Sequence, residues 1–277
     1  MGEFVTGDGV RLHYLEKGAG RPLLLLPAWG ASARWFSGQL DGLSDRFRVI
    51  ALDPRFHGKS DRPDHGARVA RTAEDVRELL DALDLHDVVL LGWSISVATV
   101  LGYFDLFGSH RIGAFVIVCG SPKPLSDESW DRGFADMNGA LAFKAFAMSD
   151  PVALANTNVP SYFVTPRSDE DLKWMIADTA ALPPAAAGVA FDCIMQDYRD
   201  LIPRLDRPAL AIYSERDPIV PGANIEFWAD ALPSSRRELF RNSGHCPPIE
   251  EADRFNQVLA EFAAEGATRP AASGTAE

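Results

Sequence analysis

The sequence predicts an α/β fold in which an open, mostly parallel sheet is flanked by helices. In residues 1–122, and again in residues 207–265, short apolar runs of strand length alternate with segments whose apolar residues recur at helical spacing. Several of these runs are continuously apolar, which is typical of parallel strands that are covered on both faces. Residues 123–206 interrupt the alternation with helical patterns and no strong strand. We therefore expect strands joined by right-handed helical crossovers, and a helical insertion that separates the two parts of the core in sequence.

The chain opens with the pattern of an antiparallel hairpin. Residues 4–6 and 12–15 form two short strand patterns, and the glycine-containing turn at residues 7–9 joins them. His13 alternates with an apolar neighbour on the second strand, so we expect it at the surface or at a sheet edge. A continuous apolar strand follows at residues 23–26.

The next elements repeat a strand and helix pattern. A short helix with one apolar face at residues 35–43 precedes a strand at residues 47–52. A second helix is expected to start at Thr72, whose hydroxyl would cap it. The buried stripe of that helix lies at residues 76–83. Further strands are expected at residues 88–91, 114–118, 208–213 and 237–240, and further helices around residues 97–104, 225–232 and 255–262.

Composition limits the class of protein. A chain of 277 residues that is 47% hydrophobic can bury a full core as one large domain, with or without an insertion. The net charge of −12 disfavours nucleic acids and anionic membrane surfaces as partners, because phosphate binding needs a basic patch. We expect a small-molecule substrate, and assembly into a homo-oligomer is left open.

The cysteines and the N-terminus bear on location. Cys119, Cys193 and Cys246 are too few for a disulfide framework in a chain of this length, and none has CxxC spacing. The first residues lack the pattern of a signal peptide, and no apolar run reaches membrane-spanning length. A reducing, cytoplasmic location is therefore expected.

The interruption of the pattern divides the chain into predicted segments. Residues 1–122 and 207–265 would form the two parts of the core, residues 123–206 a helical cap, and residues 266–277 a disordered tail. In an open parallel sheet, ligands bind outside the carboxyl ends of the strands. We expect the cap to cover that edge of the sheet.

A serine stands at the sharpest predicted turn. The strand pattern at residues 88–91 gives way within a few residues to helical spacing that begins at Val97. Such a bend holds its central residue in a strained backbone conformation and needs small side chains two positions to either side. Gly92 and Ser96 meet this need. The hydroxyl of Ser94 is therefore expected to project alone above the N-terminus of the helix.

Two further polar residues follow predicted strands. Asp217 comes after the strand at residues 208–213, and His245 comes after the strand at residues 237–240. Because the carboxyl ends of parallel strands meet at one edge, we expect Ser94, Asp217 and His245 to converge there. A hydroxyl attacks when a base takes its proton, and a carboxylate orients an imidazole for that task. The pattern predicts Ser94 as nucleophile, His245 as base and Asp217 as the partner of the base.

Residues 92–96, Gly-Trp-Ser-Ile-Ser, resemble the G-x-S-x-G nucleophile elbow of the α/β-hydrolase family. Residues 49–60, 215–221 and 243–245 also resemble landmarks of that family, in the same order. The resemblance extends over almost the whole chain. It implies an eight-stranded, mostly parallel sheet flanked by helices, with a helical cap insertion.

The same resemblance implies an oxyanion hole. Its two donors would be the backbone N–H groups of Trp29 and Ile95. The chain departs from the family pattern where Ser96 replaces the last glycine of the elbow, where Pro27-Ala28 replaces the usual His-Gly, and where Phe56 replaces a glycine. Because Pro27-Ala28 stands in place of His-Gly, the resemblance does not determine the shape of the oxyanion hole.

With a serine at the elbow, the chain resembles the acyl-transferring branch of the family. The other branch has an aspartate at this position, which forms an ester with the substrate. The resemblance implies hydrolysis of a carboxylic ester or lactone of a small, largely apolar substrate, through an acyl-enzyme on Ser94. Neither a cofactor nor a metal is expected. The pocket would be formed by Trp93, as in the haloperoxidase-like and perhydrolase-like members, and by the cap aromatics Trp130, Phe143, Phe146 and Trp174.

Two other functions stay open on the same fold. In one, His245 acts as a base without an acyl-enzyme, in a cofactor-independent oxygenase, a lyase or a biosynthetic cyclase. The segment at residues 27–29 faintly resembles a loop of the quinolone-type cofactorless dioxygenases, but those relatives usually place the acid after the preceding strand, where this chain has Cys119. In the other, the chain is a ligand-binding protein without activity, which the complete set of three residues disfavours.

Overall fold

One sheet runs through the described part of the chain, residues 1–232 and 234–266 of a computed structural model. Within these residues it has eight strands in the order β1-β2-β4-β3-β5-β6-β7-β8. The strands are β1 (Gly2–Val5), β2 (Arg11–Lys17), β3 (Arg21–Leu26), β4 (Phe47–Leu52), β5 (Val88–Trp93), β6 (Ile112–Val118), β7 (Ala209–Ser214) and β8 (Arg236–Phe240). β1 and β2 are antiparallel to their neighbours, and all later pairs are parallel. The predicted eight-stranded, mostly parallel sheet is confirmed.

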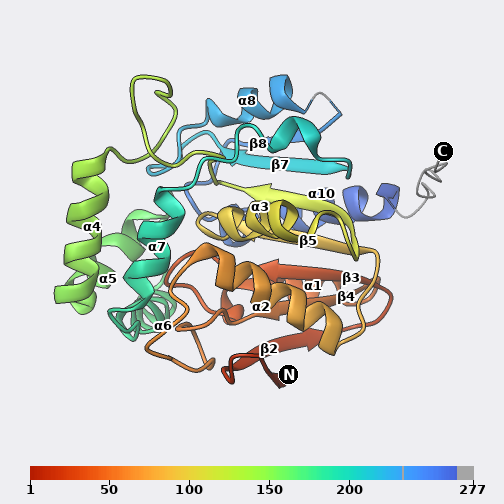
Figure 1. Ribbon diagram of the computed structural model, residues 1–277, viewed down its shortest axis with the longest axis horizontal. Helices are drawn as coiled ribbons and strands as arrows, with labels where there is room; N and C mark the ends of the chain where they lie inside the picture. Colours follow the sequence, from red (N-terminus) through yellow and green to blue (C-terminus); the bar gives the residue numbers. More distant parts are fainter. Residues whose placement is uncertain (233, 267–277) are drawn as a thin grey trace.

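Helices cover both faces of this sheet (Figure 1). On one face, α2, α3 and α8 pack with Leu24 and Leu26 of β3, and on the other face α1 and α10 pack with Leu23 and Leu25. Both faces are buried, which explains why the strands are continuously apolar in the sequence. These helices are α1 (Ser37–Leu43), preceded by a 3₁₀ turn at Ala33–Phe36, α2 (Val69–Ala82), α3 (Ser96–Phe107), α8 (Asn224–Ala231) and α10 (Ala252–Gly266).

Four α-helices and a 3₁₀ turn at Ile202–Arg204 lie between β6 and β7 in the chain. The α-helices are α4 (Met137–Ser149), α5 (Pro151–Ser161), α6 (Asp169–Ala180) and α7 (Ala186–Ile194). Figure 1 shows this helical insertion, in green, gathered beside one end of the sheet. An apolar cluster joins it to the core, where Trp29 and Phe56 pack against residues of α4, α5 and α7. The division of the chain at residues 123 and 206 stays a prediction. The predicted tail lies outside the described residues, apart from Gly266 at the end of α10.

The start of α2 differs from the prediction. The helix begins at Val69 rather than Thr72, and the preceding Arg68 makes no side-chain cap. The N–H of Val69 instead donates a hydrogen bond to Oδ2 of Asp192, 2.7 Å away on α7. The hydroxyl of Thr72 lies inside the helix and donates to the carbonyl oxygen of Val69 at 2.9 Å. The capping group is remote in sequence, so local pattern placed the start one turn too late.

His13 is buried, which contradicts the expected position at the surface or at an edge. Its Nδ1 lies 2.8 Å from Oδ2 of Asp53, a residue that follows β4. The other carboxylate oxygen of Asp53 accepts a hydrogen bond from the N–H of Ala33 at 2.6 Å. A buried polar residue needs such a partner, and here a neighbouring strand supplies it.

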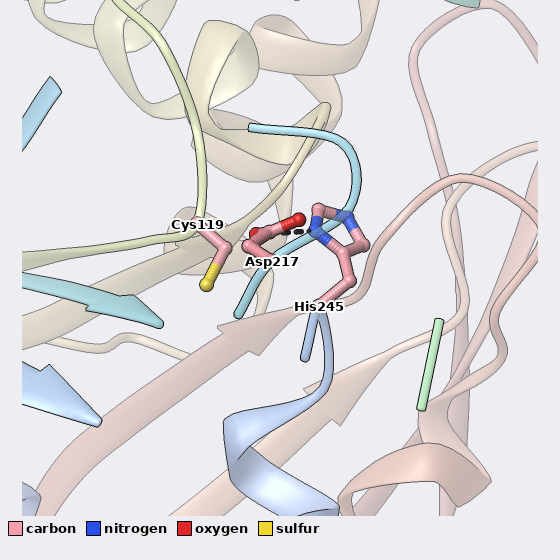
Figure 2. A group of neighbouring side chains, drawn as sticks. All are labelled: Cys119, Asp217 and His245. Atoms are coloured by element: carbon pink, nitrogen blue, oxygen red, sulfur yellow. Dashed lines mark hydrogen bonds and ion pairs between the residues drawn. The ribbon is translucent and has the colours of Figure 1, made fainter. Parts of the chain in front are cut away.

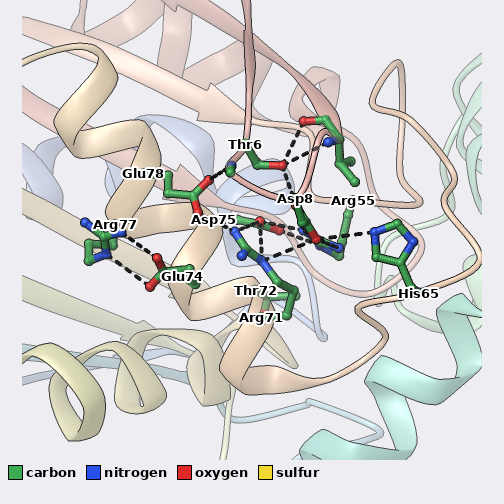
Figure 3. A network of polar contacts seen from close by, with 12 residues as sticks. Thr6, Asp8, Arg55, His65, Arg71, Thr72, Glu74, Asp75, Arg77 and Glu78 are labelled. Atoms are coloured by element: carbon green, nitrogen blue, oxygen red, sulfur yellow. Dashed lines mark hydrogen bonds and ion pairs between the residues drawn. The ribbon is translucent and has the colours of Figure 1, made fainter.

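A buried ion pair fixes the loop that follows β4. The side chain of Arg55 is fully buried, and its Nε and Nη2 donate to the two carboxylate oxygens of Asp75 on α2 at 2.6 and 2.7 Å. Figure 3 shows Arg55 in one network with Asp75 and Asp8. The carboxylate of Asp8, in the turn after β1, lies 3.2 Å from Nη2 of Arg55. The network ties together the turn after β1, the loop after β4 and α2.

All cysteines within the described residues are free and buried. No helix in this part of the chain is long and apolar enough to cross a membrane.

Candidate active site

Ser94 lies at the junction of β5 and α3 with a φ of 59°, in the left-handed region. Its N–H donates to the carbonyl oxygen of Val118 on β6 at 2.8 Å. A Cβ added at Gly92 would lie 2.6 Å from the carbonyl oxygen of Ser96, so strand and helix touch at this position. A non-glycine residue with positive φ is strained and persists only where its surroundings enforce it. The turn has the geometry expected for a nucleophile elbow.

The structure brings Ser94, His245 and Asp217 together. Nε2 of His245 lies 2.8 Å from Oγ of Ser94, and Nδ1 lies 2.9 Å from Oδ2 of Asp217. The side chains of His245 and Asp217 are only 3% and 1% exposed, so the pair is shielded from water. Figure 2 shows the Asp217 carboxylate directed at the imidazole ring, with Cys119 beside it.

Asp217 is held as a carboxylate. Burial favours its neutral form, but the adjacent His245 and hydrogen bonds outweigh that effect, and the pKa of Asp217 lies below its ordinary value. The N–H groups of Ile219 and Val220 donate to its Oδ1 at 2.8 and 3.1 Å, while Oδ2 faces the imidazole. The two amides thus fix the carboxylate in the orientation that the histidine needs.

Trp29 and Ile95 carry the two predicted oxyanion donors. Within the described residues, the backbone N–H groups of Trp29 and Ile95 donate to no other backbone group. Both residues line the cavity that also contains Ser94 and His245. The loop that carries Trp29 is braced from the insertion, because the indole N–H donates to the carbonyl oxygen of Ala186 on α7 at 3.1 Å.

This cavity has a volume of about 480 Å³ and lies between the edge of the sheet and the insertion. Most of its lining is apolar, and the polar exceptions besides Ser94 and His245 are Asp136, Asn158 and Tyr162. The apolar or small lining residues are Ala28, Trp29, Ile95, Phe134, Ala135, Gly139, Ala140, Phe143, Ala190, Ile194 and Ile219.

A family model described as alpha/beta hydrolase fold matches residues 21–252 of this sequence. The chain belongs to the α/β-hydrolase family. The match covers most of the chain and includes all three converging residues. It therefore confirms the family that the sequence motifs resemble.

Individual relatives agree with this family. The α/β hydrolase described here is 30% identical over 254 residues to a non-heme chloroperoxidase of Streptomyces lividans, and the alignment covers 88% of this chain and 89% of that protein. An esterase from Exiguobacterium antarcticum has a similar structure, with a TM-score of 0.90 at 23% identity over 95% of this chain and 100% of the other. A bromoperoxidase from Bacillus anthracis matches with a TM-score of 0.87 at 25% identity, over 94% and 99% of the two chains.

Of the predicted pocket aromatics, only Phe143 lines the cavity of this α/β hydrolase, where its ring lies 5.1 Å from that of Trp29. Trp93 lies behind the site. It is fully buried, its ring packs on Phe36 at 5.9 Å, and its indole N–H donates to the carbonyl oxygen of His245 at 2.9 Å. Trp93 therefore holds the histidine from the core side instead of lining the pocket.

The other three aromatics are also outside this cavity. Trp130 packs on Phe227 at 5.2 Å, and its indole N–H donates to the carbonyl oxygen of Lys123 at 2.8 Å. Trp174 packs edge-on against Trp35 at 5.8 Å, and Phe146 is 38% exposed on α4. These side chains pack the insertion or face outward, so aromatic character alone did not identify the lining.

Several cavity residues were missed by sequence reasoning. Asn158 and Tyr162 come from α5 and its end, Ile194 from α7, and Phe134 from the segment before α4. The ring of Tyr162 lies 5.7 Å from that of His245, and burial raises the pKa of its hydroxyl. The packing of the whole insertion over the sheet brings these residues to the cavity, and no motif in the sequence marks that packing.

The side chains of Cys119, Asp217 and His245 have potential metal-ligand atoms within 4.8 Å of one another (Figure 2). Two of the three already pair with each other. Burial raises the pKa of the Cys119 thiol well above its ordinary value, and metals bind the thiolate rather than the thiol. This group therefore fits a positioned histidine better than a metal site.

Proposed function

We propose that this α/β hydrolase cleaves a carboxylic ester or lactone of a small, largely apolar substrate through an acyl-enzyme on Ser94. The observation that carries the proposal is the continuous hydrogen-bond chain from Oγ of Ser94 through His245 to Asp217, with lengths of 2.8 and 2.9 Å. A hydroxyl becomes an effective nucleophile when an oriented imidazole can take its proton in this way.

The reaction proceeds in two halves. Oγ of Ser94 attacks the carbonyl carbon while its proton moves to Nε2 of His245. The C–O bond to the leaving group then breaks, and His245 returns the proton to the leaving oxygen. Water attacks the acyl-enzyme and gives a proton to His245, and this proton returns to Oγ of Ser94 as the acid is released. Asp217 stabilises the imidazolium that forms in each half.

The N–H groups of Trp29 and Ile95 are the proposed donors to the developing oxyanion. Ile95 precedes the first residue of α3, so the positive end of the helix dipole adds to the effect. Donors that are already aimed at the oxyanion are worth about 10² to 10³ each in rate. The site thus supplies charge stabilisation without reorganising.

The lining of the cavity supports an apolar substrate of modest size. Its walls are formed by Phe134, Phe143, Ile194 and Ile219, and it contains no lysine or arginine among the described lining residues. A carboxylate or phosphate on the substrate would find no cationic partner there, and a buried unpaired charge is costly. An acyl group without a negative charge is therefore the expected ligand.

Hydrogen peroxide is a second candidate acceptor for the acyl-enzyme. Attack by peroxide in place of water would release a peracid, which oxidises halide ions without a metal. The printed names of two relatives, a chloroperoxidase and a bromoperoxidase, favour testing this branch. Bromination of an indicator dye in acetate, bromide and peroxide would report it, and loss of that signal in Ser94→Ala would assign it to the acyl-enzyme.

Labelling with a fluorophosphonate tests the nucleophile. We expect the wild type to be labelled and to hydrolyse p-nitrophenyl acetate and butyrate, and Ser94→Ala to lose both properties, with kcat/KM lowered by about 10³ or more. Ser149→Ala, an exposed serine at the end of α4, is the matched control and keeps both. Full activity of Ser94→Ala on the true substrate would instead favour base-only catalysis by His245. A wild type without labelling or turnover would favour a binding protein.

A further inference from the structure

Glu250 joins two segments through its two carboxylate oxygens. It ends the short helix α9 (Pro247–Glu250), which follows His245. Oε2 accepts a hydrogen bond from the N–H of Gly244 at 2.7 Å. Oε1 accepts from the N–H of Val164 at 2.7 Å and from that of Thr165 at 3.2 Å. One side chain therefore connects the loop that carries His245 to the helical insertion.

A backbone contact lies next to this connection. The N–H of His245 donates to the carbonyl oxygen of Tyr162 at 2.7 Å, and Tyr162 follows directly on α5 of the insertion. A Cβ at Gly244 would collide with the same carbonyl oxygen, so the two backbones touch. On the core side, the carbonyl oxygen of His245 accepts from the indole of Trp93 at 2.9 Å. The backbone of His245 is therefore held from the insertion and from the core.

We propose that Glu250 is a positioning residue through which the helical insertion holds His245 at its working distance from Ser94. The inference rests on the proposed function and adds a role for the insertion beyond forming the pocket wall. Hydrogen bonds to a carboxylate are among the stronger ones in proteins. A displacement of about 1 Å between reacting groups lowers a rate by about 10². A looser link at Glu250 would therefore slow the chemical step even though Glu250 touches no substrate.

Glu250→Gln separates the two connections because glutamine keeps the shape of glutamate but has one acceptor oxygen. However the amide is turned, its NH₂ group faces a backbone N–H on one side, so either Gly244 or the pair Val164 and Thr165 loses its acceptor. We expect kcat per active site to fall by about 10- to 100-fold on p-nitrophenyl acetate. KM should change by less than about threefold, because Glu250 is not among the residues that line the cavity.

Glu251→Gln is the matched control. Oε2 of Glu251 accepts from the N–H of Asn242 at 3.2 Å and from the hydroxyl of Ser243 at 2.7 Å, so it anchors the same loop without a hydrogen bond to the insertion. We expect this variant to lose thermal stability while its kcat per active site stays within about threefold of the wild type. Glu250→Asp keeps both acceptors on a shorter side chain and should give an intermediate kcat. It also serves as the test if Glu250→Gln does not fold.

Active sites are counted by fluorophosphonate titration, so a smaller folded fraction does not mimic a slower step. A wild-type kcat per titrated site in Glu250→Gln would overturn the positioning role, even if the protein were less stable. If the wild type itself lacks labelling and ester turnover, the proposed function has failed instead. Hydrogen exchange then tests whether Glu250 links the His245 loop to the insertion. Faster exchange at residues 242–246 together with residues 162–166 in Glu250→Gln supports the link, and unchanged exchange refutes it.

Discussion

The hydroxyl of Ser96 donates a hydrogen bond to the carbonyl oxygen of Pro27 at 2.5 Å. Both residues are departures from the family pattern, Ser96 at the elbow and Pro27 in the loop that carries Trp29. A glycine at position 96 would have no side chain to make this bond. The elbow is therefore bonded directly to the loop that carries Trp29.

We expect Ser96→Ala to destabilise the protein by about 1 to 3 kcal/mol, because it leaves a buried carbonyl oxygen of Pro27 without a partner. The loop that carries Trp29 should loosen, so kcat/KM for p-nitrophenyl acetate should fall by about 3- to 10-fold. Chemical unfolding and ester kinetics measure the two effects. Wild-type values in both would show that the bond braces nothing.

Trp93→Phe tests the hold on His245 from the core side. Phenylalanine keeps most of the ring packing on Phe36 but removes the indole N–H that binds the carbonyl oxygen of His245. We expect kcat to fall with little change in KM, and stability to drop by about 1 to 2 kcal/mol. If Trp93 lined the acyl pocket, KM for butyrate would change more than kcat, and our placement would be wrong.

Asp217→Asn tests the charged partner of His245. The pKa of Asp217 is depressed in the folded protein, so its contribution to stability is present above the ordinary value of about 3.9 and is lost as pH falls through the lower folded value. The difference in unfolding free energy between wild type and Asp217→Asn should therefore stay constant from about pH 7 to about pH 5 and shrink below about pH 4. A difference that grew on acidification would contradict the direction of the pKa shift. The variant should also lose about 10² to 10⁴ in kcat.

Asp75→Asn tests the buried ion pair between Arg55 and Asp75. It removes the main charge partner of Arg55, whose side chain is fully buried, and we expect a loss of about 3 to 5 kcal/mol in the free energy of unfolding. The double variant Arg55→Met with Asp75→Leu should recover much of this loss, because the fully buried charge of Arg55 is then removed together with that of Asp75. Equal stabilities of the single and double variants would mean that the pair contributes packing only.

Local pattern predicted the parallel strands, the elbow and the three residues that follow strand ends, because each of these depends on residues that are near one another in sequence. The number of strands was implied by the resemblance to the family. Continuous apolar runs marked the strands, and Ser94, Asp217 and His245 each follow a strand end. The failures involve partners that are distant in sequence. Asp192 caps α2 from the insertion, Asp53 pairs with His13, and the backbone of His245 binds Trp93.

The pocket was the least predictable part for the same reason. Which side of an insertion helix faces Ser94 depends on how that helix packs, and aromatic residues such as Trp130 and Trp174 fill its packing contacts. The lining mixes small residues such as Ala140 with aromatic ones such as Phe143 and Tyr162, and no sequence pattern separates these from the residues that pack elsewhere.

The double attachment of Glu250 limits how such enzymes can be recombined. Part of the cavity lining lies on α4, α5 and α7, which invites the exchange of this whole insertion to obtain new specificities. Any graft must nevertheless reproduce the two amides at positions 164 and 165 and the carbonyl group at position 162, since these contacts support His245. Chimaeras that preserve these contacts should keep the kcat of the parent enzyme. Those that lose the contacts should bind new ligands without converting them.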